Sequence, residues 1–180
     1  MRHNMVPLCA AKLRCSGNRQ GIENVMGIEI ERKFLVTGDA WRQASKVRSI
    51  RQGYLAVGTT NTIRIRIADA EAWLGIKGKA VGGARPEFEY PVPLAEAEQL
   101  LTLTPYQVIE KTRYVLPHDG LVWEVDEFHG ANQGLIVAEV ELETVDQAIT
   151  LPDWVGKEVT DDPRYRNALL CQHPYTEWHA

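Results

Sequence analysis

Residues 28–36 read Ile28-Glu29-Ile30-Glu31-Arg32-Lys33-Phe34-Leu35-Val36 and alternate charged with apolar side chains. Successive side chains of a β-strand point to opposite faces of the sheet. A strand here would place Glu29, Glu31 and Lys33 on one face and apolar residues on the other, with Arg32 as the polar exception. The period of two therefore predicts a half-buried strand with one charged face.

The same alternation continues along the chain in short runs. Turn-forming residues, above all glycine, separate these runs, as is typical of tight connections. Neighbouring strands should therefore form antiparallel hairpins, and the fold should be mainly β. The eight predicted strands cover residues 28–36, 49–56, 62–68, 72–79, 85–92, 108–116, 121–128 and 135–143.

Helical patterns are fewer and lie between the strands. Asp39 and Asp162 are well placed to cap the first and the last of them. We expect these helices to pack outside the strands, in an α+β arrangement. The three predicted helices cover residues 39–47, 94–103 and 163–172.

A chain of 180 residues has the size of one domain. We expect a single working domain over residues 26–175, because no repeat or linker interrupts it. Residues 1–25 precede Met26 and the first strong strand pattern. We expect them to be a poorly ordered extension.

Composition is that of a soluble globular protein, with 44% hydrophobic and 24% charged residues. The net charge of -4 argues against a broad basic surface for nucleic acid. No apolar run approaches the roughly 20 residues that a membrane span needs. Cys9, Cys15 and Cys171 show no metal-binding spacing, which indicates reduced cysteines and a cytoplasmic protein.

At least six of the predicted strands separate charged from apolar faces, and most charged pairs carry one sign. For a single strand the simpler interpretation is a sheet with its polar face in water. Repetition favours a barrel whose charged faces converge inside, where buried charges need partners or bound ions. The predicted inward set is Glu29, Glu31, Glu87, Glu89, Glu124, Asp126, Glu139, Glu141 and Glu143, with Lys33, Arg64, Arg66, Lys77, Lys79, Arg85, Lys111 and Arg113.

Such an interior has the chemistry to bind a polyphosphate together with a metal ion. Arginine binds two phosphate oxygens at once, and lysine acts as a point charge. Carboxylate pairs suit a hard cation such as Mg²⁺ or Mn²⁺. The sequence therefore predicts a site for a small phosphate-rich molecule and a divalent metal.

The first strand resembles the Glu-x-Glu-x-Lys signature that opens the CYTH, or triphosphate tunnel metalloenzyme, superfamily. The resemblance extends over residues 26–172 and ends in a segment with Tyr165 and Asn167. The intervening matching segments are Gln52-Gly53-Tyr54-Leu55, Arg64-Ile65-Arg66, Ile76-Lys77-Gly78-Lys79, Glu110-Lys111-Thr112-Arg113-Tyr114, Trp123-Glu124-Val125-Asp126 and Ala138-Glu139-Val140-Glu141.

This resemblance implies an eight-stranded, antiparallel, closed tunnel barrel with a polar interior and a few outer helices. It implies that the metal ligands, which are also catalytic, are Glu29, Glu31, Glu139 and Glu141. The implied substrate-binding residues are Lys33, which also counts as catalytic, Arg64, Arg66, Lys77, Lys79, Lys111 and Arg113. A second set that could join the site is Tyr54, Arg85, Glu87, Glu89, Glu124 and Asp126.

Within the superfamily the chain resembles the small bacterial-type inorganic tripolyphosphatases. This implies hydrolysis of tripolyphosphate to pyrophosphate and phosphate with Mg²⁺ or Mn²⁺, with water as the nucleophile. Three alternatives stay open: a class IV-type adenylate cyclase, a hydrolase of thiamine or nucleoside triphosphates, and a noncatalytic polyphosphate-binding module. The expected partner is a small-molecule triphosphate, and a homodimer is compatible with the sequence.

Overall fold

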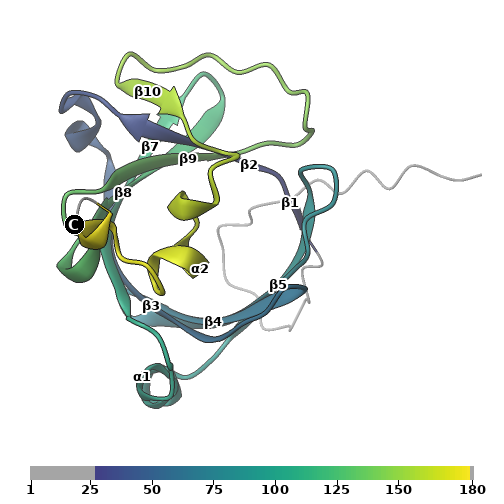
Figure 1. Ribbon diagram of the computed structural model, residues 1–180. Coiled ribbons are helices and arrows are strands. Elements are labelled where there is room, and N and C mark those ends of the chain that lie inside the picture. Colours follow the sequence, from purple (N-terminus) through teal and green to yellow (C-terminus); the bar gives the residue numbers. More distant parts are fainter. Residues whose placement is uncertain (1–26, 179–180) are drawn as a thin grey trace, which may run out of the picture.

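The computed structural model describes residues 27–178, and the predictions for residues 1–25 lie outside this range. The described residues form a mainly β fold in which every ladder is antiparallel. Figure 1 shows its strands curling around a common centre. The strands are β1 (Gly27–Glu29), β2 (Glu31–Val36), β3 (Lys46–Val57), β4 (Asn61–Ala68), β5 (Glu71–Gly78), β6 (Arg85–Pro91), β7 (Ile109–His118), β8 (Leu121–Phe128), β9 (Ile136–Glu141) and β10 (Val155–Glu158).

The order of strands across the sheet is β1-β6-β5-β4-β3-β7-β8-β9-β2-β10. Hairpins join β3 to β4, β4 to β5, β5 to β6, β7 to β8 and β8 to β9, which confirms the expected antiparallel neighbours. The longest strand, β3, also pairs with β7, although three strands and a helix separate the two in the sequence. This long-range pairing brings the two halves of the chain into one sheet.

No ladder joins the two ends of this order, β1 and β10, so the predicted closed barrel of eight strands is not confirmed. The predicted strand over residues 28–36 is in fact two strands separated by Ile30. The two strands are separate because they pair with different neighbours: β1 pairs with β6, and β2 pairs with β9. Leu142 donates its backbone N–H to the Ile30 carbonyl at 2.8 Å. The backbone at Ile30 thus connects β1, at one end of the strand order, with β2, near the other end.

Helix α1 (Leu94–Thr102) confirms the predicted helix over residues 94–103 and packs against the outer face of β3 and β4. Its Ala97 is fully buried. Gly53 of β3 permits the close approach, because a Cβ atom there would lie 3.0 Å from Leu101 Cδ2 and 3.2 Å from Thr104 Cγ2.

Two predicted helices are corrected. Within residues 39–47 the helical part is limited to the 3₁₀ turn η1 (Ala40–Gln43), and the Asp39 side chain makes no capping hydrogen bond. The segment leaves the helical path because Lys46 already pairs with Val115 as the start of β3. Residues 163–172 divide into η3 (Pro163–Tyr165) and the four-residue α2 (Asn167–Leu170).

The prediction that Asp162 caps the last helical segment is confirmed, since its carboxylate accepts from the Arg164 backbone N–H at 3.1 Å. Two further 3₁₀ turns, η2 (Gly130–Asn132) and η4 (Tyr175–Glu177), were not predicted. Strand β10 was also missed. It is four residues long, contains Gly156, and gains strand geometry only by pairing with β2.

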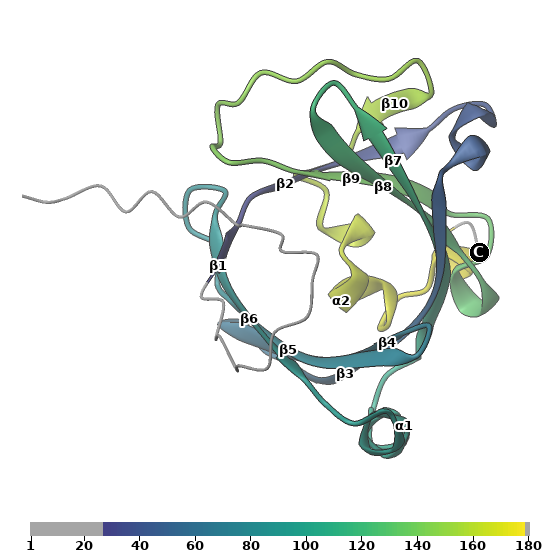
Figure 2. The ribbon, with the colours of Figure 1, turned by 180° about the vertical axis from the view of Figure 1, so that it is seen from behind.

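Apolar side chains pack on both faces of the sheet. On the outer face Phe34, Trp41, Trp123, Val125 and Val140 form one buried cluster. On the inner face a second cluster lies at one end of the curve, where residues of β3, β7, β8 and β9 meet the C-terminal segment, residues 165–178. It contains Tyr54, Ile109, Phe128, Leu135, Val137, Leu170 and Cys171. Figures 1 and 2 both show α2 within the outline of the curved sheet.

Among the helices of residues 27–178, none has the length and apolarity that crossing a membrane would require.

Candidate functional site

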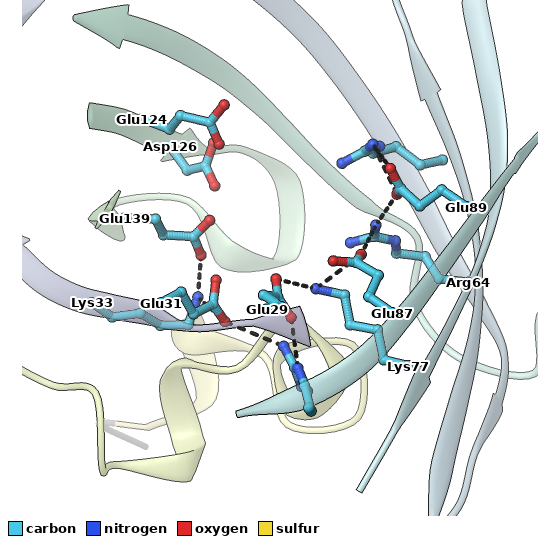
Figure 3. Close-up of polar contacts among 12 residues, drawn as sticks. Glu29, Glu31, Lys33, Arg64, Lys77, Glu87, Glu89, Glu124, Asp126 and Glu139 are labelled. Atoms are coloured by element: carbon cyan, nitrogen blue, oxygen red, sulfur yellow. Dashed lines mark hydrogen bonds and ion pairs between the residues drawn. The ribbon is translucent and has the colours of Figure 1, made fainter. Parts of the chain in front are cut away.

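Charged side chains occupy the inner face of the sheet beyond its apolar end. Directly opposite residues of neighbouring strands share a face, and the ladders pair Glu29 with Arg85, Lys77 with Glu87, and Arg113 with Asp126. Figure 3 shows the labelled charges pointing toward one another from several strands. We call this set the inner charged face: Glu29, Glu31, Lys33, Arg64, Arg66, Lys77, Arg85, Glu87, Glu89, Lys111, Arg113, Glu124, Asp126 and Glu139.

Glu29 is held between two cations from the opposite hairpin. Its carboxylate accepts from Lys77 Nζ at 2.5 Å and from Arg85 Nε at 2.7 Å. Burial alone would raise the pKa of Glu29, but the charges of Lys77 and Arg85 lower it to about 2. Arg85 also reaches Glu31 at 3.2 Å. Glu29 is therefore ionised throughout the neutral range.

Lys33 and Glu139 form the centre of a second group. The Lys33 ammonium is hydrogen-bonded to Glu139 and lies 3.2 Å from Glu31. Burial alone would lower the pKa of Lys33, but Glu139 and Glu31 raise it. Conversely, burial would raise the pKa of Glu139, but Lys33 and Arg113 hold it well below its usual value. Both groups are charged although they are buried.

Arg113 joins this group to the acidic residues of β8. Its guanidinium donates to both Asp126 oxygens, at 2.7 and 2.6 Å, and to Glu139 at 2.9 Å. A further hydrogen bond reaches Glu124. Burial opposes the charged form of Arg113, but Asp126 and Glu124 raise its pKa well above the usual value.

Arg64 and Arg66 of β4 share one carboxylate. Arg64 Nη2 lies 2.8 Å from Glu89 Oε1, and Arg66 Nη2 lies 3.0 Å from the same oxygen. Burial and the neighbouring Arg64 charge lower the pKa of Arg66 to about 10. The Nε atoms of both arginines are buried and have no hydrogen-bond partner within residues 27–178. Arg66 is thus short of negative charge, whereas the pKa of Arg64 is raised despite its burial, in part by Glu89 and Glu87.

Lys111 of β7 is also short of compensating negative charge. Its ammonium lies 2.5 Å from Asp126 Oδ2, yet burial, with the nearby Arg113 charge, lowers the pKa of Lys111 to about 8. A buried cation with a lowered pKa is stabilised by any anion that approaches it. Lys111 and Arg66 would therefore be stabilised by a bound polyanion.

The carboxylates have the chemistry that a divalent metal requires, but they are not arranged as a finished site. Among residues 27–178, no group of three or more His, Cys, Asp or Glu side chains is placed to hold a metal ion. Glu31 lies opposite Glu141, and Glu124 lies opposite Glu139. Like charges directly opposite one another are unfavourable unless a cation offsets them. These oxygen donors fit Mg²⁺ or Mn²⁺.

The structure brings nearly all of the predicted site residues onto the inner charged face. Two of them are exposed: Lys79, just beyond the end of β5, and Glu141, which shares a face with Glu31 but lies at the end of β9. Glu143, which was also predicted to face inward, is exposed beyond the end of β9. Tyr54, by contrast, is buried within the apolar end of the inner face, and burial raises the pKa of its phenol to about 12. Tyr54 is therefore a neutral hydroxyl in the physiological range.

Sequence reasoning did not place Gln52 on the inner face. It lies opposite Arg66 in the β3–β4 ladder and is almost completely buried. Its position two residues before Tyr54, on the same face of the strand, was the available signal.

A surface hollow of about 960 Å³ lies elsewhere, lined by Tyr106, Glu110 and His173 among others. It contains none of the predicted metal-binding or substrate-binding residues. We therefore place the candidate site on the inner charged face.

Comparisons with known proteins identify a family for the part of the chain that contains the inner charged face. The family model described as CYTH domain matches residues 27–167. An inorganic triphosphatase of Acetivibrio thermocellus is 44% identical over 151 residues, covering 83% of this chain and 97% of that protein. An inorganic triphosphatase of Nitrosomonas europaea is 39% identical over 148 residues, with 79% and 96% covered. The crystal structure of the inorganic triphosphatase NE1496 superposes with a TM-score of 0.60 at 35% identity, covering 79% and 93%.

Proposed function

The chain belongs to the CYTH domain family, and from this we propose that it is an inorganic triphosphatase, as its resemblance to that superfamily implied. The substrate is inorganic tripolyphosphate, and the products are pyrophosphate and phosphate. One observation carries the proposal. Two cations with lowered pKa values, the buried Lys111 and the half-buried Arg66, lie on the same inner face as ionised carboxylates such as Glu29 and Glu139.

Binding proceeds by an exchange of partners. Without substrate, the inner cations and carboxylates neutralise one another, as Arg64 and Arg66 do with Glu89. A triphosphate offers several anionic oxygens, and arginine can bind two of them at once. The cations turn to the phosphates, and the carboxylates are released for a metal ion. The substrate-binding set is Lys33, Arg64, Arg66, Lys77, Lys111 and Arg113, with Lys79 reaching from the exposed edge.

Glu29, Glu31, Glu139 and Glu141 would hold the divalent metal. Bound there, Mg²⁺ or Mn²⁺ would offset phosphate charge and lower the pKa of a bound water. Hard carboxylate oxygens are the ligands that these ions prefer. The second set, Arg85, Glu87, Glu89, Glu124 and Asp126, orients the primary residues through the ion pairs described above, and Tyr54 contributes a neutral hydroxyl.

The chemical step is attack of a water oxygen on a terminal phosphorus. The P–O bond to the bridging oxygen breaks, phosphate leaves with the water oxygen, and the bridging oxygen departs with pyrophosphate. Phosphoryl transfer needs positioning and stabilisation of charge more than it needs a protein nucleophile. The inner cations of this chain supply both, because they lie on strands of one rigid sheet.

The finer architecture belongs to the same proposal. We infer that the curved sheet works as a tunnel, with the chain at Ile30 joining β1 to β2 where no ladder connects the ends of the sheet. The C-terminal segment covers the apolar end of the inner face. A domain over residues 26–175, a cytoplasmic location and a homodimer stay predictions that size-exclusion chromatography and cell fractionation can check.

The test is to incubate the purified protein with tripolyphosphate, ATP and thiamine triphosphate in turn, with Mg²⁺, Mn²⁺ or a chelator. Products are identified by ³¹P NMR and ion chromatography. We expect phosphate and pyrophosphate from tripolyphosphate, and no turnover with the chelator. Cyclic AMP from ATP would instead identify a cyclase. If ATP or thiamine triphosphate is hydrolysed faster than tripolyphosphate, that organic triphosphate becomes the assigned substrate. Binding without turnover would identify a noncatalytic module.

A further inference from the structure

Gln52 is a buried polar residue on the inner face with an unsatisfied hydrogen-bond donor in the described part of the chain. Only 1% of its surface is exposed, and its Nε2 atom has no hydrogen-bond partner within residues 27–178. Burying an amide without a partner destabilises a fold, so such groups usually have a reason. The reason must be sought in what surrounds Gln52.

The ladders locate the Gln52 side chain on the inner face. Gln52 lies opposite Arg66 of β4 and opposite Ile109 of β7. The next residue, Gly53, faces outward, where a Cβ atom would meet Leu101 of α1 at 3.0 Å. Because side chains alternate along a strand, Gln52 must face inward.

Cations flank Gln52 from both neighbouring strands. Arg66 lies directly opposite on β4, and Arg64 lies two residues further along that strand. On β7, Lys111 lies two residues beyond Ile109. Diagonal neighbours at this spacing are about 7 to 8 Å apart, within reach of long side chains. The amide therefore lies among three of the cations proposed to bind phosphate, where the charged part of the inner face meets its apolar end.

A neutral donor is well suited to this position. Arg66 and Lys111 already have lowered pKa values, partly because of neighbouring positive charge. A fourth cation would increase that repulsion, whereas a carboxamide N–H can bind an anionic oxygen without adding charge. A hydrogen bond to a charged acceptor is stronger than one to a neutral acceptor.

We propose that the Gln52 carboxamide is a substrate-binding donor, whose Nε2–H binds a non-bridging oxygen of the phosphate group that reaches furthest toward the apolar end. The inference rests on the proposed function, since it takes a polyphosphate as the ligand of the inner charged face. It adds a neutral donor to a binding set otherwise made of lysine and arginine.

Two variants and one control test the proposal. Gln52→Met keeps the length and volume of the side chain and removes the donor. Gln52→Glu replaces the donor by an anion. Gln99→Leu is the matched control, because Gln99 is exposed on α1 outside the sheet. For each protein, KM and kcat for tripolyphosphate and the Tm with and without tripolyphosphate are measured.

In Gln52→Met we expect KM to rise by about tenfold or more, the size of one lost hydrogen bond to a charged group. The Tm without ligand should be unchanged or higher, because an unpaired buried amide has been removed. Gln52→Glu should bind tripolyphosphate still more weakly, since it repels the anion and pairs with Arg66. The control should match the wild type.

A KM change smaller than this in Gln52→Met overturns the proposal whatever the Tm, because a purely structural role lowers the folded fraction and not the affinity. Should the wild type be stabilised by tripolyphosphate without hydrolysing it, the proposed function fails. The loss of that stabilisation in Gln52→Met then supports the donor, and its retention overturns it. If tripolyphosphate neither stabilises the wild type nor is hydrolysed by it, both the proposed function and the donor role of Gln52 are overturned.

Discussion

At the scale of the residue, two glutamates of β9 that look equivalent in sequence have different surroundings. Glu139 is 8% exposed and holds Lys33 and Arg113, whereas Glu141 is exposed at the end of the strand. Both are proposed metal ligands. We therefore expect Glu139 to contribute to both folding and activity, and Glu141 to contribute to activity alone.

This difference in burial predicts different effects on stability when each glutamate is replaced by glutamine. Glu139→Gln removes one of the anions that the buried Lys33 and Arg113 share with other carboxylates, which should lower the free energy of unfolding by about 1 to 3 kcal/mol. Glu141→Gln should change it by less than about 0.5 kcal/mol while lowering kcat/KM about 100-fold, equivalent to about 2.7 kcal/mol of transition-state stabilisation. Urea denaturation and steady-state kinetics check both. Full activity in Glu141→Gln would remove it from the metal site.

Lys111 predicts the alkaline limit of activity. Burial lowers the pKa of Lys111 to about 8, so the free enzyme loses this cation as the pH rises through that value. We expect kcat/KM to fall above about pH 8, since kcat/KM reports the free enzyme. The fall in kcat should lie at higher pH, because bound triphosphate favours the charged lysine.

The control is Lys111→Arg, whose guanidinium stays charged above pH 12. In that variant the alkaline fall should disappear from the range in which the wild type loses activity. An identical pH profile in both proteins would show that another group sets the limit.

At the scale of the element, the C-terminal segment covers the apolar end of the inner face. Leu170 of α2 is fully buried against Ile109, Phe128 and Val137. A helix of four residues gains little from its own hydrogen bonds. Its place therefore depends on this packing.

Leu170→Ala should lower the free energy of unfolding by about 2 to 5 kcal/mol through the cavity that it leaves. Leu103→Ala is the matched control, because Leu103 is 69% exposed and should cost less than about 0.5 kcal/mol. Both values come from urea denaturation. Equal effects in the two variants would mean that the C-terminal segment does not cover the inner face in solution.

At the scale of the whole molecule, the inner charged face couples folding to pH. Glu29 has a pKa lowered to about 2, and the pKa of Glu139 also lies well below its usual value. Glutamate in an unfolded chain titrates near about 4.3. Between these values the unfolded chain binds more protons, so stability is present above about pH 4.3 and is lost as the pH falls toward 2.

We therefore expect the free energy of unfolding to decrease steeply from about pH 4.3 to about pH 2. Guanidinium chloride denaturation at a series of pH values measures it. Glu29→Gln should be less stable than the wild type at pH 7 and should lose less stability on acidification, because one of the linked carboxylates is gone. Parallel pH curves for the two proteins would contradict this account.

Much of the fold could be predicted because period-two alternation is local. It placed seven of the eight predicted strands close to their observed bounds, and it put Arg64, Arg66, Lys111 and Arg113 on the charged face. The helix over residues 39–47 was wrong, because the long-range pairing of Lys46 with Val115 overrides a local pattern. Strand β10 depends on the same kind of distant partner.

The sequence by itself determined the alternation, the sign of each charged pair and the family to which those motifs belong, since these depend only on the order of residues. Only the tertiary structure decided that β1 and β2 divide at Ile30 and that Lys79 and Glu141 stay exposed. It also decided that Gln52 is buried with its Nε2 atom unpaired among residues 27–178. The physical reason is that burial and ion pairing depend on which distant strands become neighbours, and adjacent residues do not encode that directly.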